Sequence, residues 1–228
     1  MRGKTFAGRI SFNFNVFGKL FEEVAKFRAA CADAGVGIAS VLPVLRWSGP
    51  DEDAREAAVR NWKRVVQIAV DLGVNVINTE FSGRPERAEE SERAFFRSME
   101  ELVPLFEREG IDVRIDPHPD DFVEDGMEAL RIIRGVNSPN IGMVYVACHS
   151  FHMGGNMSEI MAAAGDKLRL VHVADTMDHR RSHGLRYITN PPGSPARVHQ
   201  HLKIGDGDID CLDSDCIGRA APRSASTT

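Results

Sequence analysis

Apolar residues recur at helical spacing in several segments of the chain, and short, continuously apolar runs separate these segments. Between 16 and 34, apolar side chains return every three or four residues, and Gly35 follows as a stop signal. The run VGIASVLPVL at 36 to 45 has the composition of a strand that is buried on both faces. A second helix is predicted from about Asp51 to Leu72, with Gly73 at its end.

The same alternation continues through the rest of the chain. Strands are predicted at 74 to 80, 111 to 116, 141 to 146 and 168 to 174, and helices at 87 to 109, 125 to 134 and 157 to 164. Strands that alternate with helices of this length imply parallel crossovers in an α/β fold. The number of units favours a (β/α)8 barrel of the TIM type over a doubly wound sheet. A glycine-rich nucleotide-binding loop is absent from the first strand–helix connection.

Acidic or imidazole side chains follow directly where several apolar runs end. The carboxyl ends of parallel strands are where α/β proteins build their active sites, so we expect these side chains to gather around one point. They are Glu80; Asp116 and His118; His149 and His152; His172 and Asp175; and His199, His201 and Asp206.

Composition narrows the classes of function. With 228 residues, 43% of them hydrophobic and 27% charged, the chain fits one soluble domain. A formal charge of -5 and the lack of a Lys/Arg stripe predict no nucleic-acid partner. Neither a membrane-length apolar stretch nor a signal peptide is evident, so we expect a cytoplasmic protein with no membrane partner. The four cysteines form no disulfide framework, and Cys148 is expected to be a small buried apolar residue.

Five motifs, in their order and spacing, carry a family resemblance. They are DLGVNVINTEFSG, DPHP, VYVACHSFHMGG, LRLVHVADTMDHR and the late GDGDID. From about 36 to 210 the chain resembles the sugar phosphate isomerase/epimerase superfamily, the xylose isomerase-like TIM barrels. That superfamily includes inosose dehydratases and isomerases, ketose 3-epimerases and endonuclease IV. The resemblance implies one divalent metal ion (Mn, Zn, Mg or Co) that polarises a carbonyl while acidic residues move a proton between carbons.

The resemblance also implies roles for individual residues. Asp116 and His172 would hold the metal, with His149 or solvent completing its shell. Glu80 and His118 would handle protons or substrate hydroxyls, and His149 would reach either the substrate or the metal. Asp175 would orient His172 or bind substrate. The segment 179 to 203 is rich in Arg, Lys and His, and we call it the basic loop. It follows the strand at which such barrels hold phosphate, so its side chains are candidates for sugar or anion recognition. The candidates in that loop are Arg180, Arg197, His199 and Lys203.

Simpler roles remain open for these residues. Glu80 could be a solvated loop acid, and Asp120 or Asp121 could cap the following helix. His172 could be a core histidine bonded to a backbone carbonyl, and the basic loop could be a solvated face.

The chain departs from the family pattern at several positions. Asp116 stands where the family has Glu, and Val146 stands where the family has a metal-binding Asp. After Asp210 no apolar run follows that could form an eighth strand with its Glu, and the first 15 residues are too few for a whole βα unit before the first helix. We therefore expect a single partial barrel over 1 to 210 and an irregular polar tail over 211 to 228. A shortened complete barrel, a fragment, and a barrel completed by a partner chain or a second copy all stay open.

The predicted activity is isomerisation or epimerisation of a sugar, sugar phosphate or cyclitol by proton transfer alpha to a carbonyl. Two alternatives belong to other classes. An endonuclease IV-like hydrolase would need more metal ligands and a basic DNA-facing surface. The net negative charge of the chain disfavours such a surface. A catalytically impaired fragment, or a subunit that needs a partner, would have an incomplete ligand set.

Overall fold

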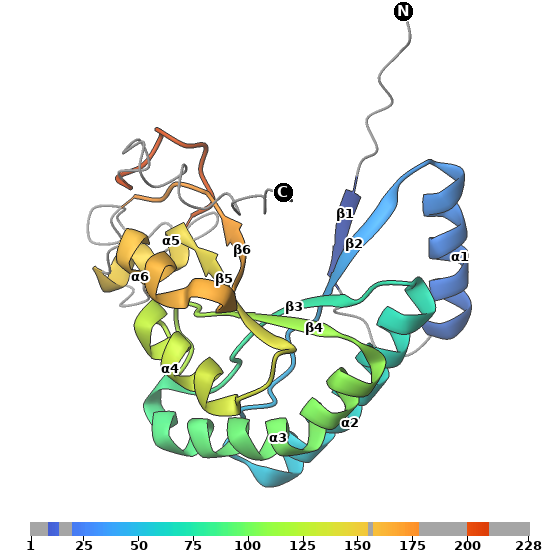
Figure 1. Ribbon diagram of the computed structural model, residues 1–228, viewed down its shortest axis with the longest axis horizontal. Helices are drawn as coiled ribbons and strands as arrows, with labels where there is room; N and C mark the ends of the chain where they lie inside the picture. Colours follow the sequence, from blue (N-terminus) through green and yellow to red (C-terminus); the bar gives the residue numbers. More distant parts are fainter. Residues whose placement is uncertain (1–8, 14–19, 155–156, 178–199, 210–228) are drawn as a thin grey trace, which may run out of the picture.

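The chain forms an open arc of parallel strands with helices on its outer face (Figure 1). The computed structural model describes residues 9–13, 20–154, 157–177 and 200–209. The order of the sheet is β1-β2-β3-β4-β5-β6, and all neighbours pair in parallel. The strands are β1 (Arg9–Asn13), β2 (Gly37–Leu42), β3 (Val76–Glu80), β4 (Asp112–Asp116), β5 (Ile141–Val146) and β6 (Leu168–His172).

Sequential strand order is the winding of a barrel, since a doubly wound sheet reverses its order at a switch point. The predicted incomplete TIM-type fold is therefore confirmed. Within the described residues β1 does not pair with β6, so the arc stays open. The polar tail predicted over 211 to 228 lies outside the described residues.

The helices begin and end close to the predicted positions. They are α1 (Leu20–Asp33), α2 (Glu52–Leu72), α3 (Ala88–Glu109), α4 (Gly126–Val136), α5 (Ala147–Ser150) and α6 (Met157–Ala164), with 3-10 turns η1 (Pro85–Arg87), η2 (Phe151–Met153) and η3 (Gly165–Lys167). The Asp51 carboxylate accepts a hydrogen bond from the Ala54 amide at the start of α2, and Gly73 ends that helix with a φ of 71°. No helix in the described part of the chain is long and apolar enough to cross a membrane.

Three local predictions were wrong. Asp125, rather than Asp120 or Asp121, caps α4, because its carboxylate accepts hydrogen bonds from the amides of Met127 and Glu128. His149 lies in the helical turn α5 instead of at the end of a strand. The segment that contains His201 and Asp206 forms no parallel strand over the described residues 200–209. Its one β-bridge there is antiparallel and joins Leu202 to Asp175.

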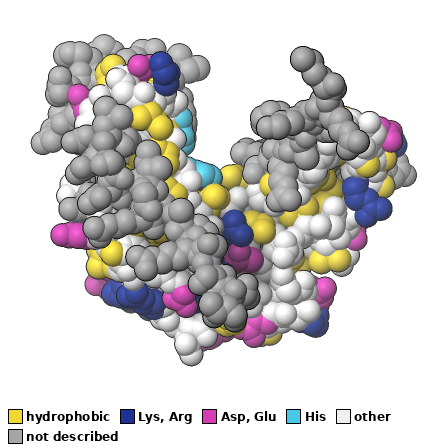
Figure 2. Space-filling model, turned by 45° about the horizontal axis from the view of Figure 1, so that its top comes forward, with side chains coloured by type: hydrophobic (Ala, Val, Ile, Leu, Met, Phe, Trp, Pro, Cys, Tyr) yellow, Lys and Arg dark blue, Asp and Glu magenta, His cyan; other side chains and the backbone are white. Residues whose placement is uncertain are grey.

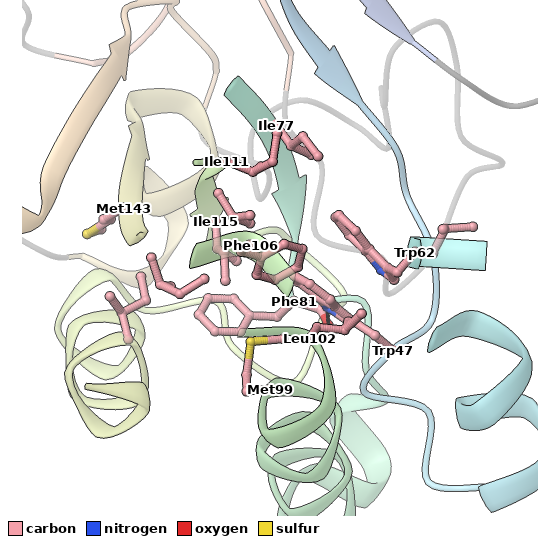
Figure 3. Close-up of a cluster of buried hydrophobic side chains, with 14 of the residues drawn as sticks. Trp47, Trp62, Ile77, Phe81, Met99, Leu102, Phe106, Ile111, Ile115 and Met143 are labelled. Carbon is pink, nitrogen blue, oxygen red and sulfur yellow. Dashed lines mark hydrogen bonds between the residues drawn. The ribbon is translucent and has the colours of Figure 1, made fainter. Parts of the chain in front are cut away.

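The main core lies between the sheet and the helices, and aromatic side chains fill its centre (Figure 3). The rings of Trp47 and Trp62 stack with centroids 4.2 Å apart, and Phe95 meets Trp47 edge-on. A smaller apolar cluster occupies the opposite face of the arc, where Val144, Val146 and Cys148 of the β5–α5 segment pack together. Because side chains alternate along a strand, β5 supplies buried residues to both faces.

The core also anchors the backbone where β3 ends. The Trp47 indole N–H donates to the carbonyl of Phe81 over 2.8 Å, and the Ser48 hydroxyl donates to the same carbonyl. The Thr79 hydroxyl donates to the carbonyl of Pro43 over 2.8 Å. These bonds fix the residues on either side of Glu80, so the aromatic core determines where that carboxylate lies.

Replacing Trp62 with Ala should lower the free energy of unfolding by about 3–5 kcal/mol, because a large, fully buried side chain would leave a cavity. The matched control is Val70→Ala on the same helix, where the side chain is 40% exposed and the loss should be small. Urea denaturation of both variants measures the difference. Equal losses would contradict the central place of the stacked tryptophans in the core.

Candidate active site

Two carboxyl groups lie side by side at the carboxyl ends of β3 and β4. Glu80 is the register partner of Asp116 in the parallel pairing of these strands. Burial raises the pKa of Asp116 to about 7, against the opposing effect of His118. Burial also raises the pKa of Glu80; His118 opposes that shift and Asp116 adds to it. Both groups can therefore gain or lose a proton closer to neutral pH than ordinary carboxylates.

His118 faces Glu80 with a defined tautomer. Its Nδ1 lies 2.8 Å from the carbonyl oxygen of Pro119. A carbonyl can only accept, so Nδ1 carries the proton and Nε2 is left as an acceptor in the neutral ring. Nε2 lies 3.9 Å from Glu80 Oε1, beyond a hydrogen bond but near enough for a small movement to form one. The structure thus brings together the two residues that were predicted to handle protons.

His149 is the most constrained side chain of the site. Its Nδ1 lies 3.0 Å from Asp116 Oδ2, and its Nε2 lies 3.3 Å from His201 Nε2. Its ring also meets that of His118 edge-on, with centroids 4.5 Å apart. Burial, with smaller contributions from the neighbouring His118 and His201, lowers the pKa of His149 to about 2. The ring therefore stays neutral, with a single proton to donate.

Cys148 and His201 complete this group; His201 was among the side chains expected to gather here, whereas Cys148 was expected only as a small buried apolar residue. Cys148 Sγ lies 3.6 Å from His201 Nε2. Within the described residues, one set of three potential metal ligands has its ligand atoms all within 4.8 Å of one another: Cys148, His149 and His201. Burial raises the pKa of the Cys148 thiol to about 12 in the absence of an ion. The residue is buried as predicted, but it lies against imidazole nitrogen as well as apolar side chains.

His172 lies at the end of β6, where Val146 of β5 is its register partner. Partial burial lowers the pKa of His172, and its ring is close enough to lower the pKa values of His149 and His201. Figure 2 shows histidine side chains on the wall of a hollow in this face of the molecule. The predicted ligands Asp116 and His149 are in direct contact, and His172 belongs to the same neighbourhood on the next strand.

Asp175, predicted to orient His172 or bind substrate, organises a loop in this structure. It is fully buried, and its carboxylate accepts hydrogen bonds from the amides of Thr176, Gly205, Gly207 and Ile209. Burial raises the pKa of Asp175, but the four donors together outweigh burial and leave the pKa below its ordinary value. A Cβ atom at Gly207 would lie 2.3 Å from Asp175 Oδ1, so glycine is required for this approach.

Asp121 fixes the loop after β3 in a similar way, a role that sequence reasoning missed. Its carboxylate accepts from the amides of Ser82, Gly83 and Phe122. Ser82 has a φ of 58°, which is uncommon for a residue with a side chain. Burial raises the pKa of Asp121 to about 6, although these three amides oppose the shift. Asp121 therefore holds the chain directly beyond Glu80.

Most of the predicted substrate-binding residues of the basic loop lie outside the described residues. Arg180, Arg197 and His199 lie outside the described residues. Lys203 is described and exposed, in the loop that Asp175 organises.

Comparison with known proteins agrees with this architecture. The family model for the xylose isomerase-like TIM barrel matches residues 11–217. The chain belongs to this family. An inosose isomerase of Bacillus velezensis is 25% identical over 132 residues, which cover 56% of this chain and 47% of the relative. This chain therefore spans about half the length of that relative.

Two solved structures show the same fold at low identity. An IOLI protein with a bound zinc atom has a TM-score of 0.65 and 22% identity, over 89% of this xylose isomerase-like chain and 71% of the other. An L-ribulose 3-epimerase has a TM-score of 0.66 and 15% identity, over 89% of this chain and 64% of the other. The predicted superfamily resemblance is thus confirmed.

Replacing Asp121 with Asn should change how stability depends on pH. Its pKa of about 6 in the folded protein exceeds that of an unfolded Asp, so its stabilising contribution is full below about pH 4 and is lost as pH rises through 6. The variant should therefore lose less stability than the wild type over this window, by about 2 kcal/mol.

Urea denaturation at pH 4, 5, 6 and 7 measures this difference. Asp120→Asn, at the exposed neighbouring position, is the matched control and should keep a constant offset from the wild type. A constant offset for Asp121→Asn as well would contradict the raised pKa.

Proposed function

We propose that this chain carries the proton-transfer site of an isomerase or epimerase that acts on a sugar, sugar phosphate or cyclitol. The observation that carries the proposal is the arrangement of Glu80, His118 and Asp116. Two carboxyl groups with raised pKa values flank an imidazole whose Nε2 is an acceptor, at the mouth of a parallel barrel. Groups poised near neutral pH are suited to removing and returning a proton.

The relatives support the choice of substrate class. One is named as an inosose isomerase, and a structural neighbour is an L-ribulose 3-epimerase. Inososes and ribulose both carry a carbonyl beside hydroxyl-bearing carbons. The proton on such a carbon is acidified by the carbonyl, so one well-placed base can start the reaction.

Each residue has a distinct task in this proposal. Glu80, in its ionised form, takes the proton from the carbon next to the carbonyl. His118 exchanges a proton with Glu80 or with a substrate hydroxyl through Nε2. An isomer forms when the former carbonyl carbon receives the proton while the adjacent hydroxyl loses its proton and the former carbonyl oxygen gains one. An epimer forms when a second acid protonates the original carbon from the opposite face. Asp121 keeps Glu80 in place through the loop that follows it.

This edge of the sheet carries donor types that suit a divalent ion. Asp116 offers a buried carboxylate oxygen, and His149 and His172 offer neutral imidazoles, which are ligand types that zinc, manganese and magnesium sites use. When bound, such an ion supplies Lewis-acid polarisation of the substrate's carbonyl and hydroxyl oxygens. Lys203, together with Arg180, Arg197 and His199, would contact the polar groups of the substrate.

Glu80→Gln should lower the rate of proton exchange by about 100- to 10,000-fold, because the amide cannot act as a base. The assay incubates the full chain and a divalent ion with an inosose or a ketopentose in D₂O. It then follows deuterium incorporation next to the carbonyl by NMR.

Glu86→Gln, at an exposed position in the same loop region, should leave the exchange rate unchanged. Wild-type exchange that persists in Glu80→Gln would remove this residue from the proposal. Absence of exchange in the wild type with every ion and substrate tried would reject the function.

A further inference from the structure

We infer that Cys148, His149 and His201 form a thiolate–imidazole site for zinc, in which Asp116 orients His149 instead of binding the ion. This inference rests on the proposed function in one respect: both need a divalent ion at the same mouth. It differs in the ligand set, because sulfur replaces carboxylate oxygen.

The distances between the donor atoms fit one ion. His149 Nε2 and His201 Nε2 are 3.3 Å apart, and Cys148 Sγ is 3.6 Å from His201 Nε2. Zinc binds imidazole nitrogen at about 2.0–2.1 Å and thiolate sulfur at about 2.3 Å in tetrahedral geometry. At a tetrahedral angle these lengths place two nitrogens about 3.3 Å apart and a nitrogen and a sulfur about 3.6 Å apart. Two of the three distances between donor atoms thus match the edges of a zinc tetrahedron, and the third, between Cys148 and His149, lies within 4.8 Å.

The hydrogen bond between Asp116 and His149 orients the imidazole for this purpose. Asp116 Oδ2 holds Nδ1 of His149 at 3.0 Å, so Nε2 points toward His201 and away from the carboxylate. A carboxylate that binds one ring nitrogen while the other binds zinc is a recurrent arrangement in metalloproteins. Asp116 is only 8% exposed, so few water molecules can compete with His149 for its carboxylate.

The inner face of β5 offers no oxygen ligand. The small cluster on this face is formed by Val144, Val146 and Cys148, against Leu170, Ala174 and Ile209. Cys148 is the one residue of this cluster whose side chain can bind a metal ion. One thiol and two imidazoles favour zinc over magnesium or manganese, which prefer oxygen. Three protein ligands are also the number that catalytic zinc sites use.

Cobalt titration of the full chain, after removal of metal with a chelator, tests the ligand set without relying on turnover. We expect one Co²⁺ to bind, with a sulfur-to-cobalt charge-transfer band in the near ultraviolet and the strong visible bands of tetrahedral cobalt. Cys148→Ser should abolish the charge-transfer band. Asp116→Asn should keep that band while weakening the affinity by about 10- to 100-fold, as expected of a residue that acts through a ligand.

Cys31→Ser is the matched control, because Cys31 is also buried but lies on α1. It should leave the band and the affinity unchanged, and circular dichroism verifies that each variant is folded. Cys211 and Cys216 stay in every variant, so a band that survives in folded Cys148→Ser would overturn the inference. Cobalt binding without a charge-transfer band, lost in Asp116→Asn, would also overturn it and would indicate an oxygen-ligand site.

The outcomes separate this inference from the proposed function. Proton exchange with a band-free cobalt complex would retain the function and reject the thiolate ligand. A Cys148-dependent band in a protein that exchanges no protons would retain the site and reject the function.

Discussion

Parallel pairing of neighbouring strands is the constraint from which the candidate site follows. Because β3 and β4 pair in register as far as Glu80 and Asp116, the two carboxyl groups must emerge side by side. The same edge receives His149 just after β5 and His172 at the end of β6. The crossover helices lie on the outside and leave this edge uncovered. The side chains at this edge can therefore be replaced without altering the core.

Three buried aspartates show how local donors decide what a carboxylate does. Asp121 and Asp175 accept from several backbone amides each, and their effect is to fix the loops after β3 and β6. Asp116 instead bonds to the imidazole of His149, and its effect is to orient that ring. A carboxylate that is saturated by amides stabilises a backbone path, whereas one bonded to a histidine controls a side chain that can act on a ligand.

Periodicity along the chain was enough to predict the strands and the helices, because both depend on which positions are apolar. Their regular alternation was enough to predict how the sheet winds. It also identified Glu80, Asp116, His118 and His149, since each follows an apolar run. It could not identify the amide bonds of Asp121 and Asp175, which depend on how loops turn back.

The contact between Cys148 and His201 was hidden from sequence reasoning, although His201 was expected near the site. Cys148 has the same sequence context whether it only fills space or also faces an imidazole. His201 reaches His149 through a loop whose path has no repeating pattern, and at Leu202 that loop forms an antiparallel bridge with Asp175. Side-chain convergence of this kind is a property of three-dimensional paths, which hydrophobic spacing does not encode.

The close contact between Gly207 and Asp175 divides the 203–209 loop into positions with different tolerance to mutation. At 207 any side chain would collide with the carboxylate and with the carbonyl of Thr176, so selection must preserve glycine there. Lys203, Ile204 and Asp206 are exposed on the same loop. Substitutions at those three positions can alter the surface of the loop while its backbone keeps its course, which makes the loop a place where specificity can diverge at little structural cost.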